Sequence, residues 1–290
     1  MHSPSDSTVT GANARAHDAI VLDLDGTLVA DDGHVRPNVR AALRRAMEAG
    51  VVVMVATGRS EAATRDVARE LGVAVPCIVY NGAGMWCPTT DAMLEERLLS
   101  NRAVERTYRA ARELDLAPVA MTHGLKVAEE PDDERLRAAL ANMTELEFAP
   151  LERFPTECLI RITLMSTGYT DSAELERDIN ARIGLPVYTT HFPLNALAPH
   201  RDSIVQVVDV QPPCRGKGEA LRYLSEVHGI DPARVVAVGD AGNDVPMFTR
   251  AGLGVAMGGA MPVALAAADR VIGDCNTDAI ADLIAELFGV

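Results

Sequence analysis

Two acidic residues, separated by one position, follow the first apolar segment of the chain. Asp23 and Asp25 lie in the run DLDGTL at positions 23–28, directly after the apolar residues 19–22. Side chains two apart in a strand lie on the same face, so both carboxylates are expected to project together from the strand's carboxyl end. Neighbouring, poorly solvated carboxylates destabilise each other, and a cation relieves that repulsion. The motif alone is equally compatible with solvated loop residues before a glycine turn.

A second acidic cluster follows another apolar segment in the same manner. Asp240, Asn243 and Asp244 lie in the run GDAGND at positions 239–244, after a strand predicted over 234–238. Ligands of open parallel sheets bind beyond the carboxyl ends of the strands, so the two clusters are expected to meet in one crevice. An oxygen-only set favours a hard ion, and Mg²⁺ fits a site shared with a phosphate. Acids in the first turn of a helix would also explain this cluster alone.

Two shorter motifs carry groups suited to phosphate. Thr57, Gly58 and Arg59 follow the apolar segment 51–56 and offer a hydroxyl and backbone N–H groups at the same edge of the sheet. Lys217 lies between two glycines at the mouth of a predicted helix, where its point charge can neutralise a carboxylate and a phosphate. Each motif is weak by itself, because a threonine before a glycine turn is common and most lysines are exposed.

The elements that must position these residues alternate between strand and helix. Apolar, β-branched runs predict strands over residues 19–24, 51–56 and 77–80, and helices are expected over 37–49 and 60–71. The alternation returns near the C-terminus, with strands at 204–210, 234–238 and 253–256 and helices at 218–228 and 244–250. This rhythm is typical of βαβ units, so we expect an α/β fold with a Rossmann-like parallel sheet covered by helices.

The middle of the chain has a different pattern. Strand candidates with alternating polar residues, at 93–98 and 158–165, are interleaved with charged helices at 101–114, 131–142 and 172–183. This predicts a separate α+β module with one solvent-facing sheet surface. We therefore expect a disordered leader over residues 1–17, a core formed by 18–84 and 199–290, and an inserted cap over 85–198.

Composition narrows the functional classes. The 290 residues carry a formal net charge of −14 and no dense run of Lys or Arg, which argues against a nucleic-acid partner. The five scattered cysteines show no metal-binding spacing and are interpreted as reduced thiols of a cytoplasmic protein. The uncharged stretch 251–268 contains four glycines and a proline, which predicts a strand, turn and helix instead of a membrane span. A monomer or a homodimer is expected.

Taken together, the four motifs DLDGTL, TGR, RGKG and GDAGND resemble the haloacid dehalogenase (HAD) superfamily of phosphohydrolases. They occur in the family's order, each at a predicted strand end. The large insertion, preceded by Asn81-Gly82-Ala83, resembles the Cof-type branch (type IIB), which has a large α/β cap. The resemblance covers nearly everything after residue 17.

The resemblance implies a role for each motif. Asp23 matches the nucleophile and Asp25 the general acid and base, while Lys217 completes the catalytic group. The resemblance implies Mg²⁺ held by Asp23, the Asp25 backbone carbonyl, Asp240 and Asn243, with Asp244 supporting them. The residues expected to contact phosphate are Thr57, Gly58, Arg59, Lys217 and Asn243.

The activity expected from these matches is a magnesium-dependent phosphatase. It would hydrolyse a small phosphorylated metabolite, a sugar phosphate or phosphorylated cofactor, through an aspartyl phosphate on Asp23. An acid at position 25 favours phosphoryl chemistry over carbon–halogen chemistry. A phosphomutase or phosphotransferase on the same core stays open, as does a non-hydrolytic phospho-aspartate switch, although a switch needs no lid over its site.

The substrate is not determined by these motifs. Several residues in the insertion or directly after it could face a leaving group, although each is more often a surface, loop or packing residue: His123, Arg161, His191, Asn195, His200 and, near the linker, Trp86.

Overall fold

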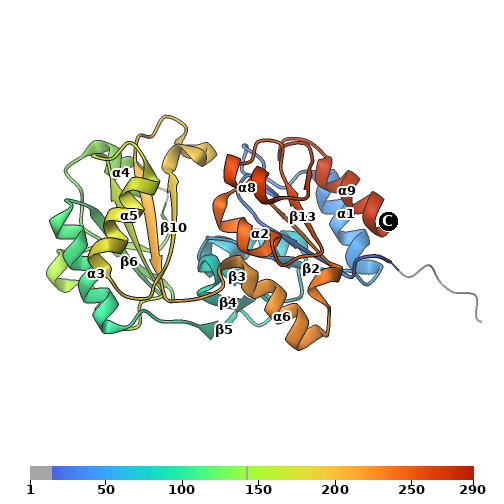
Figure 1. Cartoon of the computed structure of the whole chain (residues 1–290), viewed down its shortest axis with the longest axis horizontal. Helices are drawn as coiled ribbons and strands as arrows, with labels where there is room; N and C mark the ends of the chain where they lie inside the picture. The colour runs from blue at the N-terminus through green and yellow to red at the C-terminus, as the bar shows by residue number, and fades with distance from the viewer. Residues whose placement is uncertain (1–14, 142) are drawn as a thin grey trace, which may run out of the picture.

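The chain folds into two lobes, each built on its own sheet (Figure 1). The coordinates are a computed structural model that describes residues 15–141 and 143–290. Residues 1–14 of the leader expected over 1–17 lie outside the described residues. Asn142, the expected end of one cap helix, lies outside them as well.

The first lobe is organised around a parallel sheet with the strand order β14-β13-β12-β1-β2. Its central strand pairs on both sides in parallel register, with Ala19 opposite Val235 and opposite Val52. Every residue of β1 is buried, which agrees with the uniformly apolar sequence of a strand covered on both faces. The strands are β1 (Ala19–Leu22), β2 (Val52–Val55), β12 (Val235–Gly239), β13 (Leu253–Ala256) and β14 (Arg270–Val271).

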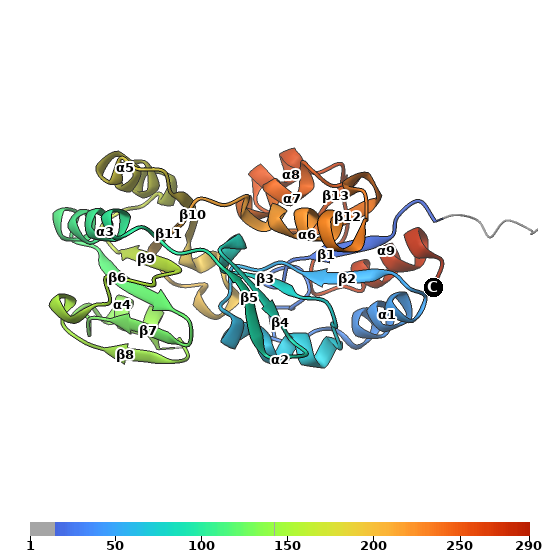
Figure 2. The same ribbon diagram turned by 90° about the horizontal axis from the view of Figure 1, so that it is seen from below.

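Helices cover both faces of this sheet (Figure 2). Alternate residues of β1 point to opposite faces, so Ile20 and Leu22 belong to one core cluster while Ala19 and Val21 belong to another. The first cluster includes residues of α1 (Pro37–Glu48), α2 (Glu61–Leu71) and α9 (Ala279–Phe288). The second includes residues of α6 (Glu219–His228), α7 (Val245–Phe248) and α8 (Pro262–Ala267).

The helix limits follow the signals in the sequence. Pro37 occupies the first turn of α1, where its missing N–H is not needed. Ser60 caps α2 by accepting a hydrogen bond from the Ala63 N–H, and Gly72 ends that helix in the left-handed conformation. The stretch 251–268 forms β13 and α8, as predicted. None of the helices in the described part of the chain combines the length and apolarity needed to span a bilayer.

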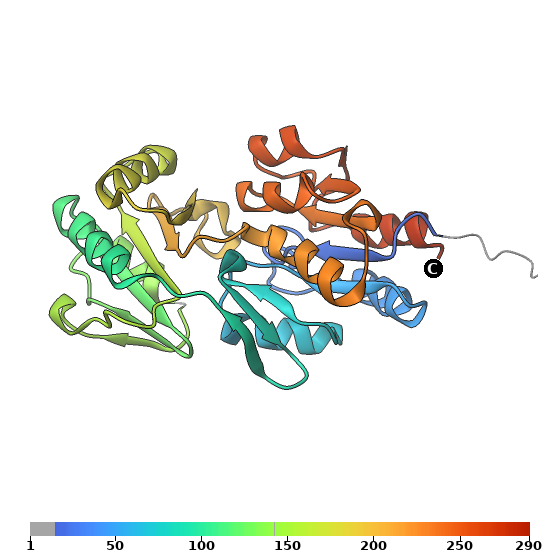
Figure 3. The ribbon, with the colours of Figure 1, turned by 60° about the horizontal axis from the view of Figure 1, so that its bottom comes forward.

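A small antiparallel sheet leads from the core towards the second lobe. It contains β3 (Cys77–Val79), β4 (Gly84–Cys87) and β5 (Ala92–Glu96), and the β4–β5 hairpin projects at the bottom of Figure 3. A single parallel bridge between Ala56 and Ile78 connects it to the end of β2. Between β3 and β4, Tyr80 and Asn81 adopt positive φ angles of 49° and 51°, an uncommon conformation for residues with side chains.

The second lobe, the cap, is a six-stranded sheet with the order β10-β11-β9-β6-β7-β8. Its pairings are antiparallel except for β7 with β8. The strands are β6 (Ala117–Thr122), β7 (Leu125–Ala128), β8 (Leu146–Phe148), β9 (Arg161–Ser166), β10 (Tyr188–Pro193) and β11 (Gln206–Gln211). The helices are α3 (Asn101–Glu113), α4 (Glu134–Leu140) and α5 (Ser172–Ile183), of which α3 and α5 pack side by side against one face (Figure 2).

One predicted strand belongs to the other lobe. The segment 204–210 was expected to resume the parallel core, but it forms β11, between β10 and β9 of the cap sheet. All six residues of β11 are buried, but Gln206, Asp209 and Gln211 are polar, unlike the residues of the uniformly apolar β1. The sheets thus place the return to the core after Gln211, later than the boundary expected at 198/199.

The chain crosses between the lobes twice, and one carboxylate contacts both crossings. Arg97 lies in the first crossing, between β5 and α3, and Arg215 lies in the second, between β11 and α6. Oε1 of the buried Glu219 accepts a hydrogen bond from the Arg215 N–H (3.1 Å) and lies 3.1 Å from Nη2 of Arg97. The two crossings therefore lie beside each other at the start of α6.

Candidate active site

The two acidic clusters meet at the carboxyl ends of β1 and β12. The Asp23 N–H donates a hydrogen bond to the carbonyl of Val238 (3.0 Å), which extends the pairing of the two strands by one residue. Gly26 has a φ of +74°, and a Cβ atom built there would lie 2.4 Å from Oδ2 of Asp240. The close approach of the two loops thus requires glycine at this position.

Lys217 lies at the centre of the site and bonds to both clusters. Its ammonium donates to Oδ1 of Asp23 (2.6 Å) and to Oδ1 of Asp244 (2.7 Å), and the residue is 1% exposed. The other oxygen of Asp244 accepts hydrogen bonds from the N–H groups of Asp240 and Ala241, both at 2.8 Å. Asp244 therefore fixes the lysine and the acidic loop at the same time.

The charges at this point are unbalanced, because two buried carboxylates, Asp23 and Asp244, and the half-buried Asp240 lie close to one ammonium. Burial raises the pKa of Asp240, and the neighbouring Asp23 and Asp244 raise it further. Burial also raises the pKa of Asp23, although Lys217 opposes the shift. Burial alone would lower the pKa of Lys217, but attraction to Asp23 and Asp244 outweighs it and raises the pKa. The excess of negative charge favours a bound cation.

The oxygen atoms available here fit a hard divalent cation. One carboxylate oxygen from each of Asp23, Asp240 and Asp244 can lie within 4.8 Å of the others. Asp244 already accepts three hydrogen bonds, whereas the carboxylate of Asp240 accepts only a long one from Thr27 (3.4 Å) among the described residues. Oδ1 of Asn243 is buried and has no partner within the described parts of the chain. Asp23, Asp240 and Asn243 thus have oxygens free for a metal ion or its water.

Asp25 faces the same space and is paired with arginine. Arg59 donates to both of its oxygens, from Nε at 2.9 Å and from Nη2 at 2.6 Å. Thr57 is fully buried, and its hydroxyl accepts a hydrogen bond from the Arg59 N–H (3.1 Å). Arg59, expected at the phosphate, thus binds Asp25 in this structure, and Thr57 supports the turn that carries it.

Asn81 connects the core loops to the cap. Its side-chain oxygen accepts a hydrogen bond from Nδ2 of Asn243 (3.0 Å), and its Nδ2 donates to the hydroxyl of Thr190 on β10 (3.2 Å). Sequence reasoning gave Asn81 no role of its own. Its left-handed backbone, which asparagine tolerates better than most residues, is the signal that could have identified it.

A cavity of about 860 Å³ lies between the core loops and the cap sheet. Most of the predicted site residues line it: Asp23, Asp25, Gly58, Arg59, Lys217, Asp240 and Asn243. Thr57 and Asp244 do not line the cavity and lie behind those residues.

The cap wall of the cavity contains some of the expected residues and several unexpected ones. Arg161, His191 and His200 line it, whereas His123 and Asn195 do not. His123 lies at the contact between the lobes, with Nδ1 3.3 Å from Oε1 of Glu61. Sequence reasoning missed the following cap residues of this wall: Lys126, Thr163, Thr190 and Asp209.

Two other features lie outside the cavity. Trp86 is fully buried and donates from Nε1 to Asp91 (3.2 Å), which indicates packing instead of stacking on a ligand.

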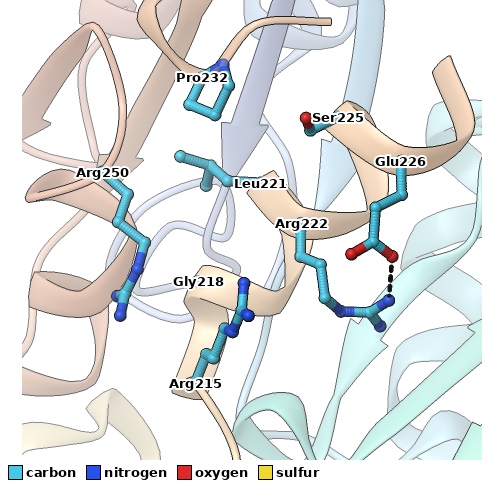
Figure 4. A pocket seen from close by; sticks show the side chains of 8 residues that line it. All are labelled: Arg215, Gly218, Leu221, Arg222, Ser225, Glu226, Pro232 and Arg250. Atoms are coloured by element: carbon cyan, nitrogen blue, oxygen red, sulfur yellow. Dashed lines mark hydrogen bonds and ion pairs between the residues drawn. The ribbon is translucent and has the colours of Figure 1, made fainter. Parts of the chain in front are cut away.

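A smaller hollow of about 290 Å³ lies beside α6 (Figure 4). There Arg222 is already paired with Glu226 at 2.7 Å, and none of the predicted site residues lines the hollow.

Comparison with known proteins decides the family. A profile described as haloacid dehalogenase-like hydrolase matches residues 20–284, nearly the whole chain. The chain belongs to this family. It is therefore an enzyme of the hydrolase class, and its cap of α-helices and an antiparallel sheet fits the Cof-type branch.

Individual members of the HAD family align along nearly their full lengths. The pyridoxal phosphate phosphatase YbhA of Escherichia coli is 29% identical over 281 residues, which cover 91% of this chain and 96% of that protein. The HMP-PP phosphatase of Cronobacter sakazakii is 27% identical over 262 residues, with 90% and 92% covered. A haloacid dehalogenase-like hydrolase from Bacteroides thetaiotaomicron superposes with a TM-score of 0.74 at 25% identity, covering 94% of this chain and all of that one.

Proposed function

We propose that this HAD-family chain is a magnesium-dependent phosphatase that hydrolyses a small phosphorylated metabolite through an aspartyl phosphate on Asp23. The observation that carries the proposal is the convergence of Asp23, Lys217 and Asp240 at one end of the cavity between the core and the cap. Relatives named as phosphatases of pyridoxal phosphate and of HMP-PP support a small phosphorylated cofactor or precursor as the substrate.

Asp23 supplies the nucleophile in this mechanism. One carboxylate oxygen attacks phosphorus, and the alcohol leaves with a proton from Asp25, which must first exchange its pairing with Arg59 for that proton. In the second step Asp25 takes a proton from water, which displaces the phosphate from Asp23. Asp25 faces the cavity beside Asp23, so both steps use groups on the same wall.

Charge at phosphorus is neutralised from the core side. Lys217 is held by Asp23 and Asp244, so its ammonium is already oriented when the phosphate enters. Asp23, Asp240 and Asn243 would hold Mg²⁺, which supplies positive charge beside the nucleophile and the phosphate oxygens. Asp244 keeps both the lysine and the Asp240 loop in place and needs no direct contact with substrate.

The test is release of inorganic phosphate from 4-nitrophenyl phosphate. Asp23→Asn is expected to lower kcat at least about a thousandfold, because the amide is not a nucleophile. Asp66→Asn, an exposed aspartate on α2, is the matched control and should retain wild-type activity. EDTA should stop turnover and Mg²⁺ restore it. Turnover by Asp23→Asn within tenfold of wild type contradicts the proposal, and activity without free phosphate points to a phosphotransferase.

A further inference from the structure

The sequence contains only two lysines, Lys126 and Lys217, against 25 arginines. Both lysines are buried, at 7% and 1% exposed, and both line the same cavity. Lys217 enters it from the core and Lys126 from the cap strand β7. Lysine is mostly an exposed residue, so two buried lysines at opposite walls of one cavity point to a use for each.

The two ammonium groups differ in their partners. Lys217 contacts two carboxylates, whereas Nζ of Lys126 donates to the carbonyl oxygen of Thr144 (2.7 Å) and to its hydroxyl (3.3 Å). Within residues 15–141 and 143–290, no carboxylate oxygen lies within 4.0 Å of Nζ of Lys126. Lys126 is therefore a buried cation bonded only to neutral oxygens, and such a charge is destabilising unless a counter-charge arrives.

A second cation stands in the same row of the cap sheet. Met121 of β6 lies opposite Lys126 on β7 and opposite Arg161 on β9, so the three side chains share one face. Nε and Nη2 of Arg161 lie 3.2 and 3.1 Å from the sulfur of Met121. The row presents a cation, a thioether and a cation to the cavity.

Arg161, unlike Lys126, is compensated by the protein. Its Nη1 donates to Oδ2 of Asp209 (3.2 Å) and to the backbone carbonyl of Gly58 in the core (2.6 Å). Asp209 also accepts a hydrogen bond from the hydroxyl of Thr163 (2.5 Å). The charge of Arg161 is thus matched by Asp209 in direct contact, whereas Lys126 has no carboxylate in contact with it among the described residues and is attracted only from further away, by Glu145 and Glu61.

We propose that Lys126 binds a second anionic group of the substrate, a carboxylate or a second phosphate, on the part of the molecule that leaves after cleavage. This inference rests on the proposed phosphatase function and adds to it the class of leaving group. The phosphoryl group being transferred occupies the Lys217 end of the cavity, and the second anion lies at the cap wall, where it supplies the counter-charge that Lys126 lacks.

Matched substrate pairs test the proposal in the full-length protein with Mg²⁺. 6-Phosphogluconate is compared with glucose 6-phosphate for a carboxylate, and fructose 1,6-bisphosphate with fructose 6-phosphate for a second phosphate. In the wild type, kcat/KM is expected to be at least about tenfold higher for the anionic member of one pair, and that pair identifies the anion. In Lys126→Met the ratio within that pair should fall towards one.

Two further variants separate recognition from structure. Lys126→Arg keeps the charge and should keep most of the ratio. Arg109→Met removes one positive charge from the exposed face of α3 and should leave the ratio unchanged, since a general effect of net charge would alter both variants alike. A merely structural role of Lys126 would lower kcat/KM for both members of a pair equally.

The outcomes also distinguish this inference from the function on which it rests. If the wild type hydrolyses 4-nitrophenyl phosphate but shows no preference for either anionic substrate, the subsite is overturned and the phosphatase stands. An unchanged ratio in Lys126→Met also overturns the subsite. If neither 4-nitrophenyl phosphate nor any member of the pairs is hydrolysed, both proposals fail.

Discussion

The two ends of the cavity differ in the sign of the buried charge that is in excess. At the core end, Lys217 is surrounded by carboxylates, and negative charge is in excess. At the cap end, Lys126 is bonded to neutral oxygens of Thr144, and no carboxylate of the described residues contacts its ammonium. The core end is thus prepared for a cation and a phosphoryl group, and the cap end for an anion. A substrate with a phosphate at one end and a second anion at the other satisfies both.

The ends also differ in how the chain builds them. The core end is assembled mainly from short loops at the ends of β1, β2 and β12, so Asp23, Arg59 and Asp240 come shortly after their own strands in sequence. Lys217 is the exception, because it lies between β11 and α6. The cap end depends on cross-strand register, which brings Lys126, Met121 and Arg161 into one row from three strands. The chemistry of the first end is therefore largely local in sequence, whereas that of the second is not.

The sharpest test of this contrast replaces each lysine by methionine. Lys217→Met leaves Asp23 and Asp244 without their cation, and breaking a buried ion pair costs about 3–5 kcal/mol of unfolding free energy. Lys126→Met removes only bonds to neutral oxygens, so its stability should lie within about 1 kcal/mol of wild type. Urea denaturation at pH 7 measures both. Similar losses for the two variants would remove the difference on which the comparison rests.

Metal binding probes the excess of negative charge at the core end. Mg²⁺ at a hundredfold excess over its dissociation constant should stabilise the protein by about 2.7 kcal/mol and raise Tm. Asp240→Asn removes one ligand and should lose most of that increase, while Asp66→Asn should keep it. Differential scanning calorimetry with and without Mg²⁺ is the measurement. Full retention of the increase by Asp240→Asn would place the ion elsewhere.

Arg161 tests how firmly the cap wall is joined to the core. Arg161→Met removes the bond to the Gly58 carbonyl and leaves the buried Asp209 with Thr163 as its remaining partner, at a cost of about 2–3 kcal/mol. Arg161→Lys keeps the charge but loses the planar fork, so an intermediate loss is expected. Equal stability of all three proteins in urea denaturation would show that this contact does not hold the lobes together.

The smallest expected effect is a pH dependence at the cap end. Burial, with repulsion from Arg161, holds the pKa of Lys126 below its usual 10.5, and Glu145 and Glu61 oppose the shift. The folded protein therefore binds fewer protons than the unfolded chain between the lowered pKa and 10.5. The destabilising contribution of the charged lysine is complete below the lowered pKa and disappears as pH rises through this window.

The free energy of unfolding of the wild type relative to Lys126→Met should accordingly increase from neutral to alkaline pH. Urea denaturation of both proteins at a series of pH values measures the difference. A difference that stays constant, or one that decreases with pH, would mean that burial of the charged Lys126 does not lower the free energy of unfolding.

Sequence reasoning placed residues together correctly where they follow neighbouring strands of the core. Asp23, Asp25 and Asp240 follow apolar strands whose parallel order brings their carboxyl ends together, and the predicted α/β core with an inserted cap is confirmed. The pairing of Arg59 with Asp25 could not be foreseen, because a TGR turn does not fix where the arginine points.

The cap was harder to predict for the same physical reason. β11 was assigned to the wrong sheet because five of the seven residues at 204–210 are Val or Ile, which favours a strand in either lobe, while its pairing with β9 and β10 is not visible in the sequence. Lys126 was missed because its burial arises from register between β6 and β7, which the sequence does not display. The rarity of lysine in the chain was the one available signal.

Glu219 gives the two walls of the cavity a common anchor. Its carboxylate lies against both segments that connect the lobes, through Arg97 on the way out and the backbone of Arg215 on the way back. Because this contact holds the two connecting segments together, we expect the cap to open by rotating about them and not by sliding over the core. A side chain that never touches the substrate would then set how wide the entrance can become.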